Sequence, residues 1–248
     1  MNESMENLRV VLVATRNPLN MGAAARAMSN FGALHLRAVK PFEKAYRESV
    51  SAVGASAVMN SAEEFASVPQ AVVDCSLVVG TTAVGNRDVR QPLLGLPEAA
   101  RLIRQRMATS RVALLFGSEK RGLSNDDMSY CHCLLQIPTR EEHRSMNLGQ
   151  AVAVCLYELS KGEIGSSKLE IPAAETADEK HFVTMETVER ITEAWLDALL
   201  RSGYVGARAR ATSEEKLRRM LRRFNWEESD AEVVLGMMKK IAAKLNND

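Results

Sequence analysis

The sequence predicts an α/β domain with a mostly parallel sheet, followed by a small all-helical domain. Apolar, β-branched segments alternate with helical patterns through roughly the first 160 residues, and this alternation is typical of a parallel sheet with crossover helices. Beyond a Ser-, Gly- and Ala-rich charged stretch without any period, only helical spacing returns. We therefore expect an α/β domain over 1–162, a linker over 163–180 and a helical domain over 181–248.

The elements of the first domain follow from local signals. The run LRVVLVAT at 8–15 is apolar and β-branched, which suits a strand buried on both faces. A helix follows the turn RNPLN, with Asn20 as the expected N-cap and Gly32 as the C′ residue. Further strands are expected at 33–39, 76–82, 111–117 and 131–137, and further helices near 97–109 and over about 147–160.

The tail carries three segments with helical spacing, and its charge is uneven. Between Arg201 and Arg223 there are eight basic residues against Glu214 and Glu215, a local charge of +6. Taken alone, such a run is more often a solvated helix face than a binding site. Beside a catalytic domain directed at RNA it becomes a candidate for neutralising phosphates. The helical segments are expected over 182–205, 213–226 and 230–245.

Composition limits the class of protein. The formal net charge is only +1, so any case for nucleic-acid binding has to be local. The longest apolar region is interrupted by Asp74 and is too short to span a bilayer, and the start lacks the basic region of a secretory signal. Four cysteines are too few for a disulfide framework. We expect a cytoplasmic protein with reduced thiols.

Three segments carry polar and small residues where strands give way to helices. The first, NPLNMGAAARAMSNFG, sets one large cation, Arg26, among small residues that would let its helix pack closely against another surface. A lone arginine here is as often a surface residue whose stem covers apolar neighbours. The second, LLFGSEKRGLSNDD, places glycines after a buried strand, as α/β folds do where they admit a ligand. The third begins at Ile137-Pro138, and Ser145 or Asn147 caps the helix that follows.

Together these segments resemble the SpoU (TrmH-type) branch of the SPOUT RNA methyltransferases, over residues 8 to about 160. That family has N-x-G-x-x-x-R, then F-G-x-E-x-x-G-L, then I-P and S-x-N-x-x-x-A, in this order. The helical tail resembles the C-terminal extension of the TrmJ subgroup, which methylates a ribose of the tRNA anticodon loop, at nucleotide 32. The matching residues are Asn20, Gly22, Arg26, Phe116, Gly117, Glu119, Gly122, Leu123, Ile137, Pro138, Ser145, Asn147 and Ala151.

The resemblance implies a C-terminal trefoil knot, a homodimer and S-adenosylmethionine as cofactor. It assigns catalytic roles to Arg26, Asn20, Glu119, Ser145 and Asn147. It places the cofactor against Thr81, Thr82, Ala83, Gly117, Ile137, Ser145, Met146 and Leu148. RNA would be bound by Arg87, Arg208, Arg210, Arg218, Arg219 and Arg222, with either Arg87 or Arg90 filling the family's position after the threonine pair.

The implied reaction is an in-line transfer of a methyl group to a ribose 2′-hydroxyl, which requires alignment and removal of the hydroxyl proton. The family assigns proton removal to the arginine of the first segment, although guanidinium has no acceptor. Either a crowded site lowers the pKa of Arg26, or Arg26 holds a substrate phosphate that relays the proton. No metal is expected, because Cys131-His132-Cys133 lacks a second ligand pair and fits strand alternation. An rRNA methyltransferase and a non-catalytic RNA-binding homologue are the alternatives.

Overall fold

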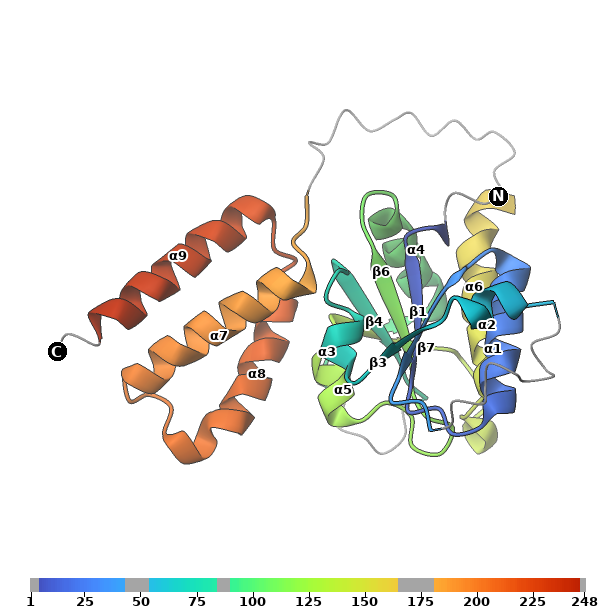
Figure 1. The fold of residues 1–248 in the computed structure, drawn as a ribbon, viewed down its shortest axis with the longest axis horizontal. Helices are drawn as coiled ribbons and strands as arrows, with labels where there is room; N and C mark the ends of the chain where they lie inside the picture. Colours follow the sequence, from blue (N-terminus) through green and yellow to red (C-terminus); the bar gives the residue numbers. More distant parts are fainter. Residues whose placement is uncertain (1–4, 43–53, 84–89, 165–180, 246–248) are drawn as a thin grey trace. The chain divides into compact units, whose positions relative to one another are not determined.

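The computed structural model describes residues 5–42, 54–83, 90–164 and 181–245 (Figure 1). The chain divides into two compact units, Met1–Ala173 and Ala174–Asp248, which are described separately. Nearly all of the stretch expected as a linker, 163–180, lies outside the described residues, and its first two residues still belong to a helix of the first unit. Within the described ranges, no helix combines the length and the apolar character needed to cross a membrane.

The first unit contains a seven-stranded sheet in which every strand pair is parallel. Its strand order is β3-β2-β1-β6-β4-β7-β5, so strands distant in the sequence lie side by side at the centre. All six residues of β1 are buried, which explains why its sequence is continuously apolar apart from one arginine. The expected α/β fold is confirmed. The strands are β1 (Leu8–Val13), β2 (His35–Val39), β3 (Glu63–Phe65), β4 (Leu77–Thr81), β5 (Leu93–Gly95), β6 (Val112–Phe116) and β7 (Cys133–Gln136).

Helices cover both faces of this sheet, with α1 and α6 on one side and α3 and α5 on the other (Figure 1). The trefoil knot that the resemblance implies stays a prediction. The helices are α1 (Pro18–Phe31), α2 (Ser56–Asn60), α3 (Val68–Ala71), α4 (Leu96–Met107), α5 (Asn125–Ser129) and α6 (Leu148–Ile164), with a 3₁₀ turn, η4 (Glu141–His143).

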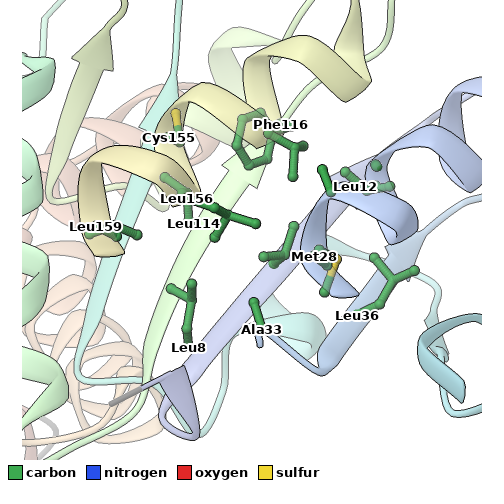
Figure 2. Packing of buried hydrophobic residues seen from close by; sticks show 14 of the residues in the cluster. Leu8, Leu12, Met28, Ala33, Leu36, Leu114, Phe116, Cys155, Leu156 and Leu159 are labelled. Carbon is green, nitrogen blue, oxygen red and sulfur yellow. The ribbon is translucent and has the colours of Figure 1, made fainter. Parts of the chain in front are cut away.

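An apolar core lies between the central strands and helices α1, α4 and α6. Figure 2 shows side chains of β1 and β6, such as Leu12 and Leu114, facing Met28 of α1 and Leu156 of α6. These four side chains are completely buried. Burying an aliphatic side chain of this size contributes about 1.5–3 kcal/mol, so this contact fixes both helices on the sheet.

Helix α1 begins three residues earlier than the sequence predicted. Asn17 is its N-cap, and the Asn17 side chain accepts a hydrogen bond of 2.9 Å from the backbone N–H of Leu19. Pro18 occupies the first turn, where its fixed φ suits a helix and its missing N–H is not needed. The N-cap expected at Asn20 was therefore wrong, and Asn20 lies inside the first turn. The expected end is confirmed, because Gly32 adopts a left-handed φ of 75°.

The small residues of α1 allow close packing against α6 of the same chain. Ala24 and Ala25 are fully buried, and Gly22 is buried beside them. A Cβ atom placed on Gly149 of α6 would lie 2.8 Å from the Cβ of Ala23, closer than two carbon atoms approach. The two helices thus meet through glycine and alanine, and this contact brings the first turn of α1 beside the start of α6.

Four short elements were not predicted from the sequence. The strands β3 and β5 have three residues each, and the helices α2 and α3 have five and four. A hydrophobic period needs a longer window than these segments offer.

The regular elements that the structure describes in the second unit are helices, as expected. Helix α7 packs against both α8 and α9, and Figure 1 shows the two beside it. A backbone hydrogen bond joins the segment before α7 to the segment between α8 and α9: the N–H of Val183 donates to the carbonyl of Trp226 over 3.1 Å. The helices are α7 (Met185–Arg201), α8 (Arg210–Arg222) and α9 (Glu228–Lys244), with a 3₁₀ turn, η5 (Ala207–Ala209).

The glycine contact between α1 and α6 leads us to expect that replacing glycine by alanine has opposite effects on stability at Gly149 and at Gly236. Gly236 of α9 has no atom within 4 Å of an added Cβ, so Gly236→Ala should raise the unfolding free energy by about 0.5–1 kcal/mol. Gly149→Ala inserts a methyl group against Ala23 and should lower the unfolding free energy by about 1–3 kcal/mol. Thermal unfolding of both variants measures the difference. Equal stabilisation by the two alanines would contradict close packing at Gly149.

Candidate active site

A cavity of about 290 Å³ opens at the carboxyl ends of β6, β4 and β7, which are neighbours in the sheet. Ligand sites of open parallel sheets lie at this edge. The structure brings all the expected cofactor residues to this one cavity, although they come from three distant parts of the chain. These residues are Thr81, Thr82, Ala83, Gly117, Ile137, Ser145, Met146 and Leu148.

One wall of the cavity is a tight loop that follows β6. The N–H of Gly122 donates to the carbonyl of Ser118 over 2.8 Å, and Gly122 has a left-handed φ of 64°. The returning chain passes directly over Gly117, where an added Cβ would lie 2.0 Å from the carbonyl carbon of Gly122. Gly117 is therefore required by the close approach of two backbone segments, and this approach shapes the cavity.

The carboxylate of Glu119 in this loop lies at the centre of a polar network. It accepts a hydrogen bond of 2.9 Å from the Asn20 side-chain amide. It also accepts from the backbone N–H groups of Arg16 and Asn17, each over 3.3 Å. Glu119 thereby joins the loop after β6 to the turn after β1 and to the first turn of α1.

Asn147 extends the same network to α6. Its side-chain amide donates to the side-chain oxygen of Asn20 over 3.1 Å, while its own oxygen accepts from the N–H groups of Gly149 and Gln150 over 2.9 and 3.4 Å. Asn147 thus caps α6, which answers the choice between Ser145 and Asn147. Asn20 stands between Glu119 and Asn147, and the three motif segments meet in one chain of hydrogen bonds.

The network also controls the charge of Glu119. Burial alone would raise the pKa of this carboxyl group. Hydrogen bonds from the Asn20 side chain and from backbone N–H groups outweigh burial, so the pKa of Glu119 lies below its ordinary value. Glu119 is therefore a permanent acceptor at neutral pH, suited to ordering the loops.

Three of the five candidate catalytic residues do not line the cavity: Asn20 and Asn147 reach it through the network, and Arg26 belongs to neither. Arg26 is exposed on α1 and is absent from the cavity wall, while Ser145 lines that wall and Glu119 joins it to the network. Several cavity residues were not expected from the sequence. They include the cations Lys120, Arg121 and Arg144, and also Thr139, all at positions within or beside the motifs that the motif patterns leave unspecified. Their place between motif residues is the signal that would have identified them.

The expected RNA-binding residues of the second unit differ in exposure. Arg208 and Arg210 are exposed, and Arg219 forms an ion pair with Glu215. Arg218 and Arg222 are buried and form ion pairs with Glu189 of α7. The expectation that these two bind RNA is corrected: they hold α8 on α7, because a buried guanidinium requires a carboxylate partner. Arg87 lies outside the described residues.

The Cys131-His132-Cys133 segment is explained by strand packing. The Nδ1 atom of His132 accepts a hydrogen bond of 3.0 Å from the backbone N–H of Val78, so this nitrogen is occupied by β4. Burial raises the pKa of the Cys133 thiol to about 12, which keeps it protonated. In the part of the chain that the structure describes, no three His, Cys, Asp or Glu residues are grouped to hold a metal ion.

A family model described as the SpoU rRNA Methylase family matches residues 7–157, which include the sheet, the cavity and the network. The chain belongs to this family. It is therefore a methyltransferase, and the cavity at the carboxyl edge of its sheet lies in the matched region.

Relatives extend the likeness to the whole chain. The tRNA (cytidine/uridine-2′-O-)-methyltransferase TrmJ of Sodalis glossinidius (strain morsitans) is 32% identical over 238 residues, covering 96% of this chain and 92% of the relative. The protein of that name from Cronobacter sakazakii (strain ATCC BAA-894) is 32% identical over 243 residues, covering 98% of each. The crystal structure of TrmJ from Z. mobilis ZM4 is 29% identical with a TM-score of 0.80, covering 94% of this chain and 98% of that one.

The lowered pKa of Glu119 predicts a pH-dependent loss of stability in acid. A carboxylate with a depressed folded-state pKa stabilises the fold above the unfolded pKa, about 4.3, and this contribution is lost as the pH falls through the folded pKa. Glu119→Gln lacks the contribution, so the wild-type advantage in unfolding free energy should shrink as the pH falls below about 4.3. Denaturant unfolding at several pH values measures it. The control is Glu142→Gln, which changes an exposed carboxylate outside the network. If the difference in unfolding free energy between the wild type and Glu119→Gln did not change with pH, the network would be contradicted.

Proposed function

We propose that the chain transfers a methyl group from S-adenosylmethionine to a ribose 2′-hydroxyl of tRNA, at nucleotide 32 of the anticodon loop. The observation that carries this proposal is the hydrogen-bond chain through Glu119, Asn20 and Asn147, which gathers three separate motif segments at one cavity. Relatives named as tRNA (cytidine/uridine-2′-O-)-methyltransferases match nearly the full chain, including the helical unit. Such a substrate places the enzyme's work in the cytoplasm.

The cavity residues suit S-adenosylmethionine. Leu135, Ile137, Leu148 and Ala151 give an apolar surface for adenine, and Thr82 lines the cavity with them. The Thr81 hydroxyl already donates to the carbonyl of Leu115 over 2.9 Å, so it shapes the wall and keeps no free proton for the ligand. When bound, the cofactor supplies a methyl group activated by its sulfonium.

The cations near the cavity suit a polyanionic substrate. Lys120, Arg121 and Arg144 line the cavity, and each would attract the phosphates on either side of the target ribose. Arg26 is exposed, as a phosphate-binding residue has to be. Of the two accounts of proton removal, we adopt the one in which Arg26 holds a substrate phosphate that accepts the hydroxyl proton. In the expected homodimer, Arg26 would approach the cavity of the second copy, since it does not line its own.

The substrate class is tested by methyl transfer from labelled S-adenosylmethionine to purified tRNA and to ribosomal RNA, followed by mapping of the 2′-O-methyl group. We expect label in tRNA at nucleotide 32. Label confined to ribosomal RNA would favour the rRNA alternative, which the family description names. Absence of calorimetric binding of S-adenosylmethionine would favour the non-catalytic alternative.

Arg26→Lys separates catalysis from cofactor binding. Lysine keeps the charge but loses the planar fork that binds phosphate through two donors, so the turnover number should fall by about 100-fold or more. The dissociation constant of S-adenosylmethionine should not change, because Arg26 is not part of the cavity wall. Single-turnover kinetics and calorimetry measure the two effects, with the exposed Arg101→Lys of α4 as matched control. Near-normal turnover would exclude a catalytic role for Arg26.

The exposed arginines near the start of α8 predict a salt-dependent contribution to tRNA binding. In the double variant Arg208→Ala/Arg210→Ala, the slope of log affinity against log salt should fall by about 2, because each lost phosphate contact removes about one released counterion. Filter binding at several salt concentrations measures the slope. Lys239→Ala, an exposed cation of α9, is the control. An unchanged slope in the double variant would contradict phosphate contacts at these positions.

A further inference from the structure

Helix α9 presents an apolar stripe away from the helical unit that it belongs to. Val233, Met237 and Ile241 recur every four residues and are 60%, 50% and 46% exposed. The opposite side of the helix, with Ala231 and Ala242, is buried in the unit, where α9 packs on α7. Side chains four residues apart lie on one helix face, so the three form a continuous ridge.

The charges along this ridge have opposite signs at its two ends. Asp230 lies seven residues before Met237, and Lys244 lies seven residues after it, both exposed. Val233 and Ile241 lie four residues before and after Met237. On this ridge the positions four and seven residues on either side of Met237 are therefore complementary: apolar with apolar, and acid with base.

We propose that this ridge is an interface with a second copy of the same chain, in which two α9 helices pack antiparallel about a two-fold axis at Met237. A two-fold contact places each residue against the residue equally far on the other side of the axis. Met237 then meets Met237 of the second copy, Val233 meets Ile241, and Asp230 meets Lys244. The helical units thus pair through their own contact, which does not depend on how the methyltransferase units associate.

A parallel pairing of the same helices lacks this complementarity. It would set Asp230 against Asp230 and Lys244 against Lys244, and like charges in contact are unfavourable. The three apolar side chains give a small contact that is weak by itself, and any second link between two copies would raise its occupancy by effective concentration.

Disulfide trapping in the full-length chain tests the antiparallel geometry. All four native cysteines are buried, so Met237→Cys adds a single accessible thiol. At a two-fold axis the two introduced side chains face one another at disulfide distance. We expect a covalent dimer under mild oxidation, formed about fivefold faster or more than with Glu232→Cys, an exposed position on the flank of the helix that the axis does not pair with itself. Equal rates for the two cysteines, or no dimer from either, would overturn the proposal.

Charge exchange provides the second arm of the test. In the Met237→Cys background, Asp230→Lys sets two pairs of lysines against each other and should slow trapping by about fivefold. Adding Lys244→Asp restores the opposite charges in exchanged positions and should restore the rate. A double exchange as slow as the single one would overturn the antiparallel register, since the acid–base pair is then not formed.

Discussion

The site depends on the chain of hydrogen bonds that runs from Glu119 through Asn20 to Asn147. Each of these residues belongs to a different segment, and each follows or precedes an element fixed by the core. Glu119 collects three donors, which keeps it ionised, and Asn147 turns its oxygen to the first turn of α6. Glu119 and Asn147 are exposed and Asn20 is half-buried, so each hydrogen bond contributes little alone, and it is their number that joins the three segments. The cavity takes its shape from these three segments together, because no one of the three residues could hold all of the segments in place.

Close backbone packing makes that network possible. Gly149 lets α1 and α6 meet at Ala23, which brings Asn20 within hydrogen-bond distance of Asn147. Gly117 permits the loop after β6 to fold back over its strand, which sets Glu119 beside the turn after β1. The glycines and alanines of the motifs thus allow the backbone segments to approach closely, while the polar residues orient the segments through hydrogen bonds. A methyl transfer that relies on alignment needs both.

Sequence patterns predicted the long elements well and the short or charged features poorly. The stripe of α6, with Val152 and Leu156 fully buried, follows the helical period, and β1 follows from its apolar run. The start of α1 was missed because Pro18 in the first turn outweighed the cap signal of Asn20. Which basic residues of α8 are buried in ion pairs depends on Glu189. This residue lies 29 positions before Arg218, and no local pattern links the two. The meeting of three motifs at one cavity came from family resemblance, since no local period links residues about 100 positions apart.

The central claim is that Asn20 and Asn147 act as one unit in shaping the cofactor cavity, and a double-mutant cycle measures this coupling directly. The affinity for S-adenosylmethionine is determined by calorimetry for the wild type, for Asn20→Ala, for Asn147→Ala and for the double variant. Residues of one hydrogen-bond network are non-additive, so the double variant should bind within about twofold of the weaker single variant. Affinity losses that simply add would show that the two asparagines act independently and would contradict the account.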